Sequence, residues 1–153
     1  MMKSYFKDTP FNDEILNQNC VVPIRTLGGG DRCHQKAIRD LAYSEKHKII
    51  ISCGFDFEVF VWNPYMPGEP IIKLDGHESP LIGVQCLSDL NCFISADSKG
   101  IIKVWNILDY NCTQTFCVPD VSSVTCMTVV PKHRRLVVCG SRIWKVFEYS
   151  RPF

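Results

Sequence analysis

Residues 76–106 read GHESPLIGVQCLSDLNCFISADSKGIIKVWN, and this stretch shares its spacing with the sequence just before it. Trp105 lies 28 residues after His77, and Trp62 lies 28 residues after His34. The two tryptophans are therefore 43 residues apart. Self-similarity at a fixed period of this length is typical of repeat proteins. The chain is expected to contain repeated copies of one structural unit.

Each copy consists of short apolar runs separated by turn-forming residues, which is a strand pattern rather than a helical one. The runs of the second copy cover residues 81–84, 92–95, 101–105 and 112–116. A third copy has runs at 124–130, 136–139 and 143–149, and Phe147 stands 42 residues after Trp105. The pattern predicts four strands in each complete copy and a degenerate third copy without a tryptophan at this position.

Several spaced residues agree in the two complete copies. They are Gly76-His77, Ser95, Asp97 and Val104-Trp105-Asn106 in the second copy, and Ser52, Asp56 and Val61-Trp62-Asn63 in the first. These residues resemble the WD-repeat (WD40) family, and the resemblance covers about residues 20–149. It implies an all-β fold, a partial β-propeller of three four-stranded antiparallel WD-like blades, of which the third is degenerate.

The chain is expected to divide into five segments. They are an N-terminal extension (1–19), an outer strand with its loop (20–33), a first blade (34–76), a second blade (77–119) and a degenerate third blade that lacks its outer strand (120–153). Closed propellers have about four to eight blades. Three blades therefore favour a segment of a larger propeller protein. The alternatives are two copies that close a ring by exchanging outer strands, or an open arc that binds a partner along its uncapped edge.

The resemblance implies a buried polar network in each complete blade, in which a histidine, a serine, an acid and a tryptophan hydrogen-bond in series. The implied residues are His34, Ser52, Asp56 and Trp62 in the first blade and His77, Ser95, Asp97 and Trp105 in the second. Asp56 precedes its tryptophan by six residues, whereas Asp97 precedes its own by eight and Lys99 takes the sixth position. This spacing favours an incomplete network in the second blade. In the third copy, Asp120 and Phe147 replace the histidine and the tryptophan, which predicts a blade without the network.

Loop tips on a rigid strand scaffold are where binding residues are expected. The resemblance implies a candidate partner-binding face formed by Arg32, Gln35, Phe55, Phe57, Glu78 and Lys99. Phe55 and Phe57 flank Asp56 in a tight turn, so at most one of the two rings is expected to point inward. The alternative is that both rings pack under neighbouring loops.

Composition excludes several function classes. The 153 residues are 46% hydrophobic and 22% charged with a formal net charge of +1, so no overall field attracts nucleic acid or an anionic membrane. No apolar run is long enough to cross a membrane, and the first residues show no secretory signal, which favours the cytoplasm.

The nine cysteines include no Cys-x-x-Cys pair and are expected to be reduced, buried residues. The Gly28-Gly29-Gly30 stretch lacks the Gly-Lys-Ser/Thr of a phosphate-binding loop. No catalytic, cofactor-binding or metal-binding residue is assigned, and no cofactor is expected.

The predicted function is a non-enzymatic scaffold that binds other proteins. One alternative is a regulatory or assembly subunit of an enzyme complex. Another is phosphopeptide or phospholipid binding through the basic turn at residues 132–135. Finally, Gly54-Phe55-Asp56 through Val61-Trp62-Asn63-Pro64-Tyr65 resembles long cilia-associated WD-repeat proteins, which implies a ciliary location as an alternative to the general cytoplasm.

Overall fold

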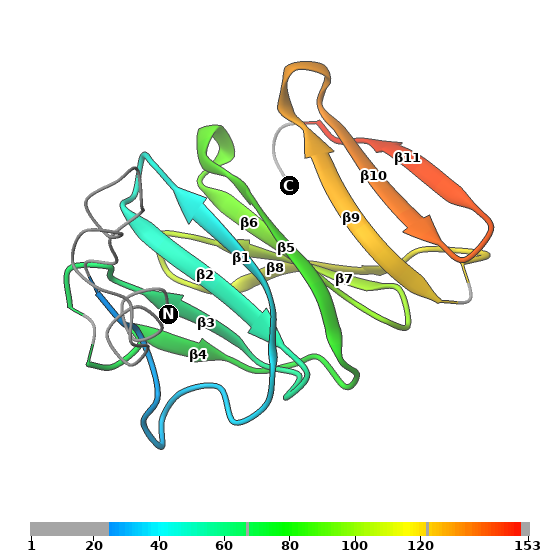
Figure 1. The fold of residues 1–153 in the computed structure, drawn as a ribbon. Coiled ribbons are helices and arrows are strands. Elements are labelled where there is room, and N and C mark those ends of the chain that lie inside the picture. Colours follow the sequence, from blue (N-terminus) through cyan, green and yellow to red (C-terminus); the bar gives the residue numbers. More distant parts are fainter. Residues whose placement is uncertain (1–24, 67, 122, 151–153) are drawn as a thin grey trace, which may run out of the picture.

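The computed structural model of the chain describes residues 25–66, 68–121 and 123–150, and they form three antiparallel sheets that follow one another along the sequence (Figure 1). The first sheet has the order β1(Ile38–Ser44), β2(Ile49–Gly54), β3(Val59–Trp62), β4(Ile72–Leu74). The second has the order β5(Leu81–Leu87), β6(Cys92–Asp97), β7(Ile101–Asn106), β8(Cys112–Cys117). The third consists of β9(Val124–Val130), β10(Arg135–Gly140) and β11(Trp144–Glu148). The predicted all-β partial propeller is confirmed.

The first hairpin of each sheet turns in the same way. The residue just before the second strand is left-handed in all three sheets: Lys48 with φ 55°, Asn91 with φ 52° and Arg134 with φ 50°. In the second and third sheets a short 3-10 turn precedes this residue, at Ser88–Leu90 and Pro131–His133. Equivalent backbone geometry at equivalent positions shows that the sequence repeat is also a structural repeat.

The three sheets stack face to face through apolar side chains. Ile51 and Val61 of the first sheet pack against Val84 and Phe93 of the second. On its other face the second sheet packs against the third through a separate cluster that includes Ile94, Val104, Met127, Leu136 and Val138. The second sheet is therefore covered on both sides, and all six residues of β6 are buried.

Polar contacts fix how the first sheet sits on the second. The innermost strand β1 lies against β5, the innermost strand of the next sheet. Asp40 Oδ2 accepts a hydrogen bond from the Val84 amide at 3.1 Å, and the Ser44 and Ser88 hydroxyls are 2.9 Å apart. Gly83 leaves room for this carboxylate, because a Cβ at that position would lie 3.3 Å from Asp40 Oδ2.

Among the described residues, two sheet faces are not covered by another sheet. On the first sheet, Leu41 and Tyr43 are exposed on the face opposite the second sheet. On the third sheet, the face opposite the second sheet carries the exposed residues Trp144 and Val146. We call the latter surface, with Cys126, Val137 and Cys139, the free face of the third sheet.

The expected outer strand near the N-terminus lies partly outside the described residues. Residues 20–24 lie outside the described residues, as does the expected N-terminal extension, and residues 25–29 form no strand. Leu27 instead packs on the cluster of Cys33, Phe60 and Trp62, on the uncovered side of the first sheet. The exchange of an outer strand between two copies stays a prediction.

The cysteines differ from the expectation of uniform burial. All eight described cysteines are free thiols, and Cys20 lies outside the described residues. Burial raises the pKa of Cys53 to about 12 and that of Cys92 to about 11. The expectation is wrong for three cysteines, since the outermost strand β8 and the uncovered side of β9 expose Cys112, Cys117 and Cys126.

Candidate functional site

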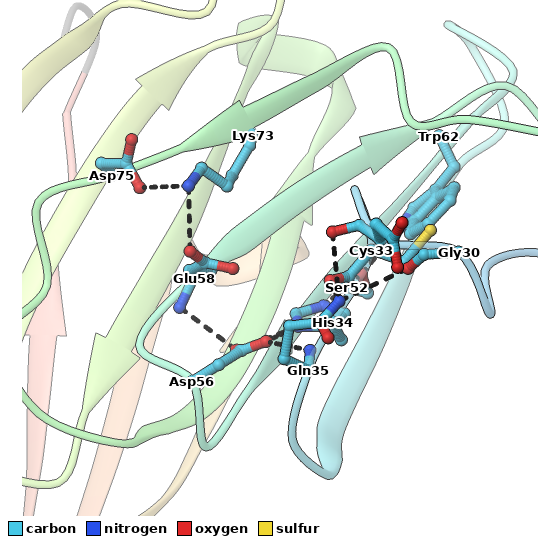
Figure 2. A network of polar contacts seen from close by, with 11 residues as sticks. Gly30, Cys33, His34, Gln35, Ser52, Asp56, Glu58, Trp62, Lys73 and Asp75 are labelled. Carbon is cyan, nitrogen blue, oxygen red and sulfur yellow. Dashed lines mark hydrogen bonds and ion pairs between the residues drawn. The ribbon is translucent and has the colours of Figure 1, made fainter.

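The first blade brings four side chains from four segments into one chain of hydrogen bonds (Figure 2). Trp62 on β3 donates its indole N–H to the Ser52 hydroxyl on β2 at 2.8 Å. The Ser52 hydroxyl lies 2.8 Å from His34 Nε2, in the loop before β1. His34 Nδ1 lies 2.8 Å from Asp56 Oδ2, in the turn between β2 and β3. The network thereby joins the loop before β1 to the two middle strands.

The second blade repeats this network with similar distances. Trp105 donates its indole N–H to the Ser95 hydroxyl at 2.9 Å, and this hydroxyl lies 2.7 Å from His77 Nε2. His77 Nδ1 lies 2.9 Å from Asp97 Oδ2. All four of these residues are buried. The expectation of an incomplete network in this blade is therefore corrected.

The acid reaches the histidine from a different position in each blade. Asp97 ends β6, two residues after the network serine, where the first blade has Gly54. A Cβ at Gly54 would lie 3.1 Å from Asp56 Oδ1 and 3.2 Å from His34 Nδ1. In the first blade the carboxylate folds back from the turn into the space that glycine leaves. In the second blade the strand residue itself supplies the carboxylate, so the change of spacing from six to eight residues preserves the contact.

The direction of the second network follows from its chemistry. A carboxylate only accepts, so His77 Nδ1 carries the proton that is donated to Asp97. Burial lowers the pKa of His77 below its ordinary value of 6.5, and this effect outweighs the opposite influence of Asp97. The neutral imidazole then accepts at Nε2 from the Ser95 hydroxyl, which in turn accepts from the Trp105 indole. Every polar atom in the series has a partner.

The third sheet carries apolar residues where the other two blades carry this network. In the pairing register, Val138 and Phe147 take the positions of Ser95 and Trp105. Phe147 packs near Phe116 of the second sheet, with ring centroids 6.5 Å apart. Asp120 lies on the surface and pairs with Lys145 at 3.3 Å.

Phe55 and Phe57 both lie exposed at the tip of the turn between β2 and β3. Their residues are 43% and 37% exposed, respectively. The Lys36 ammonium lies 5.8 Å from the centroid of the Phe57 ring, a cation–π distance. The Phe55 amide donates to the Ala37 carbonyl at 3.0 Å, which ties this turn to the loop before β1.

Phe57 has an unusual backbone conformation, with φ at 68°. The equivalent residue of the second blade is Gly100, with φ at 86°. A left-handed conformation costs a residue with a Cβ roughly 1–2 kcal/mol, a cost that glycine avoids. The first blade thus has a bulky aromatic residue at a position where the second blade has glycine, which adopts this conformation without strain.

The other four partner-binding candidates lie in three places. Arg32 and Gln35 line a cavity of about 630 Å³ on the uncovered side of the first sheet, whose lining also includes Phe60 and Lys73. Arg32 pairs with Glu69 at 3.6 Å, while the Gln35 amide donates to the Cys33 carbonyl at 2.8 Å and so holds its own loop in shape.

Glu78 and Lys99 are exposed in the two loops at the equivalent end of the second blade. The Ser98 amide donates to the Pro80 carbonyl at 2.9 Å and so joins these two loops. The hydrogen bond from Phe55 to Ala37 joins the equivalent loops of the first blade in the same way. The sequence gives no signal for Lys36 as a partner of Phe57, because their contact depends on how the two loops fold together.

The basic turn at residues 132–135 is partly committed to other contacts. The Arg135 guanidinium pairs with Glu148 at 2.6 Å. Lys132 and Arg134 line a cavity of about 430 Å³ together with the carboxylate residue Asp89. A carboxylate in the same cavity disfavours a phosphate ligand there.

Two kinds of site are not found in the described parts of the chain. No cluster of three or more histidine, cysteine or acidic residues there could hold a metal ion. No helix among the described residues is long and apolar enough to span a membrane.

Comparisons with a family model and with curated proteins both place the chain among WD-repeat proteins. The chain matches the family described as "WD domain, G-beta repeat" over residues 22–63 and 68–106, more than half of its length. It is 34% identical over 125 residues to "Cilia- and flagella-associated protein 337 B" of Tetrahymena thermophila, covering 78% of this chain and 10% of that protein. It is 36% identical over 73 residues to "WD repeat-containing protein on Y chromosome" of Drosophila willistoni, covering 48% of this chain and 7% of that protein. The chain thus spans a tenth or less of the length of these curated relatives.

Replacing the central hydroxyl of the second network is expected to destabilise the chain. Ser95→Ala leaves the Trp105 N–H and His77 Nε2 without their shared partner, at a cost of about 1–3 kcal/mol for each buried group. Urea titration of the free energy of unfolding measures the loss. Ser98→Ala is the matched control, because the hydrogen bonds of Ser98 to Pro80 and Val124 use its backbone atoms, which the substitution keeps. Equal stability of the two variants would contradict a stabilising role for the network.

Acidification is expected to weaken the second blade through His77. Because its pKa is lowered in the folded chain, the unfolded chain binds more protons between that lowered pKa and 6.5. The free energy of unfolding should therefore rise with pH through this window and fall as the pH drops below 6.5. An NMR titration of the His77 ring measures the pKa directly, and a value at or above 6.5 would refute the assignment.

Proposed function

Because the chain belongs to the WD-repeat (WD40) family, we propose that it is a scaffold without catalytic activity that binds a partner protein at the loop tips of its first two blades. WD repeats generally mediate protein–protein interactions, and WD40-repeat proteins are generally non-catalytic. The proposed contact surface is centred on Phe55 and Phe57 and is bordered by Lys36. Glu78 and Lys99 of the second blade extend it, and Arg32 and Gln35 form its outer border on the first blade.

The conformation of Phe57 is the observation that carries this proposal. A strained backbone at an exposed aromatic residue lowers the stability of the chain, and strain of this kind gathers where it serves binding or catalysis. Exposed aromatic residues on a rigid turn are also the kind of side chain that contributes most to protein interfaces. The two hydrogen-bonded loops beneath the rings hold them in place before a partner arrives, which reduces the entropy lost on binding.

The chemistry of this surface indicates the partner's complementary surface. The Phe57 ring and the Lys36 ammonium lie side by side. A matching partner presents an apolar side chain next to a carboxylate. The apolar side chain then buries the Phe57 ring, and the carboxylate pairs with the Lys36 ammonium.

The proposed setting is the cilium or flagellum. Its support is the similarity to the Tetrahymena protein, whose name associates it with cilia and flagella. The alternative setting is the general cytoplasm, where the chain would serve as a regulatory or assembly subunit of an enzyme complex. The two settings differ in which partners co-purify with the chain.

Replacing Phe57 with glycine, the residue type at the equivalent position 100 of the second blade, is expected to weaken partner binding without lowering stability. Phe57→Gly removes the ring and relieves the backbone strain, so the free energy of unfolding should not fall, while partner recovery should drop at least about tenfold. The measurement is affinity capture from a ciliated-cell extract with quantitative mass spectrometry, together with urea titration.

The matched control is Leu108→Ala, which removes an exposed apolar side chain at the opposite end of the second blade. Leu108 is 70% exposed, in the turn between β7 and β8. Partners that are lost with Phe57→Gly and kept with Leu108→Ala support the surface. Partners recovered equally with both variants would remove the surface from consideration, and enzyme subunits among the lost partners would favour the alternative setting.

The ciliary setting has a test of its own. The tagged chain, expressed in Tetrahymena thermophila, is expected to be enriched in isolated cilia relative to cell bodies, compared with the tag alone. A distribution identical to that of the tag would exclude a ciliary location for this chain. Retention of partner capture in that case would leave the scaffold function standing.

A further inference from the structure

Two free thiols face each other on the free face of the third sheet. Cys139 on β10 is paired directly with Cys126 on β9 in the antiparallel register. From this pairing we propose that Cys126 and Cys139 are a redox-active thiol pair, which peroxides oxidise to a disulfide and which small thiols reduce again.

The strand register provides the geometry that a disulfide needs. Residues directly opposite in antiparallel strands project to the same face, with Cα atoms about 4.5–5.5 Å apart. Disulfides join residues whose Cα atoms are about 4.4–6.8 Å apart. The pair is the last regular one before a register shift between Cys139 and Gly140, and its direct pairing places the two Cα atoms in the range that a disulfide spans. Next to the pair, Thr125 donates its hydroxyl to the Cys139 carbonyl at 3.3 Å and holds the two strands together.

Accessibility assigns different roles to the two sulfurs. Cys126 is exposed, whereas Cys139 is half-buried between β9 and β11. An oxidant in solution therefore reaches Cys126 first, and Cys139 is in place to resolve the product. Cys53 and Cys92 do not compete, because burial raises their pKa values to about 12 and about 11 and keeps their thiols protonated.

The equivalent positions of the other two blades do not carry a thiol pair. In the second blade Ala96 is paired with Gly83, and in the first blade Cys53 is paired with Asp40. The exposed cysteines of β8 also lack a thiol opposite them, since Cys117 is paired with Ile101 and Cys112 with Trp105. Among the described strand pairings, this thiol pair is specific to the third blade.

The chemistry balances with a peroxide as the oxidant. The Cys126 thiolate attacks one oxygen of hydrogen peroxide, the O–O bond breaks, and the products are a sulfenic acid and hydroxide, which takes up the thiol's proton as water. The Cys139 thiol then attacks the sulfenic sulfur, so that an S–S bond forms, the S–O bond breaks and a second water leaves. The two sulfurs lose two electrons in total, and the peroxide is reduced to two waters.

The disulfide changes the surface on which it forms. Trp144 is paired with Cys139 on the other side and is 67% exposed, so the two cysteines and this indole form one row across the free face. Oxidation joins β9 covalently to β10 in the middle of that row. It replaces two thiol donors beside the indole by an apolar disulfide.

The test uses the full chain with Cys112 and Cys117 replaced by serine. In this background the tryptic peptide that carries Cys126 has no other cysteine, and trypsin separates it from Cys139 at Lys132, Arg134 and Arg135. The reduced protein is treated with equimolar hydrogen peroxide and digested without reductant. We expect one linked peptide pair, a mass loss of two hydrogen atoms in the monomer, and full recovery of both thiols with dithiothreitol.

Cys126→Ser in the same background should abolish the linked pair and the mass loss without changing the far-UV circular dichroism. Phenylarsine oxide tests the proximity of the thiols without oxidation, since one arsenic atom should block both thiols in the parent and fail to do so in Cys126→Ser. A disulfide between two chains, a link from Cys139 to another cysteine, or overoxidation of Cys126 without any link would overturn the proposal.

Discussion

The burial of apolar sheet faces is the constraint on which this structure depends. A sheet that is apolar on both sides is stable in water only when each side packs against another layer. The second sheet meets this requirement completely, since the first sheet covers one side and the third covers the other. The first and third sheets each keep one uncovered side, and that is where the exposed residues Leu41, Tyr43, Trp144 and Val146 lie.

The second network lies between the first two sheets, whereas the first network lies on the uncovered side of the first sheet, where residues of the loop before β1 cover it. In both places each buried polar atom needs a partner. The two networks satisfy this need and at the same time hold the loops before β1 and β5 against the strand turns. His34 and His77 lie in those loops, so the buried hydrogen bonds position the exposed residues next to them. The proposed binding surface is thus a consequence of core polar chemistry: Phe55 and Phe57 flank Asp56, which anchors their turn to His34.

The spacing of His34, Ser52 and Trp62, repeated in His77, Ser95 and Trp105, predicted the repeat, and the resemblance that these residues carry implied the blades. The same spacing misjudged Asp97. A linear distance of six or eight residues does not show that Asp56 folds back into the space that Gly54 leaves, whereas Asp97 supplies its carboxylate from the strand position equivalent to Gly54. Burial of the cysteines was also misjudged for Cys112, Cys117 and Cys126. Their apolar neighbours in sequence alternate between the two sides of a strand, and only the stacking of the sheets decides which side is covered.

The sequence by itself determined the repeat and the strand pattern, because these depend on periodicity and on residue types that recur at fixed intervals. The residues of the two networks followed from the resemblance to the WD-repeat family. Tertiary structure alone decided three further features: the contact between Lys36 and Phe57, the left-handed strain at Phe57, and the pairing of Cys126 with Cys139. Each of them depends on the folding of a turn or on the register of two strands. Register and turn geometry are set by packing over the whole sheet, which local sequence does not encode.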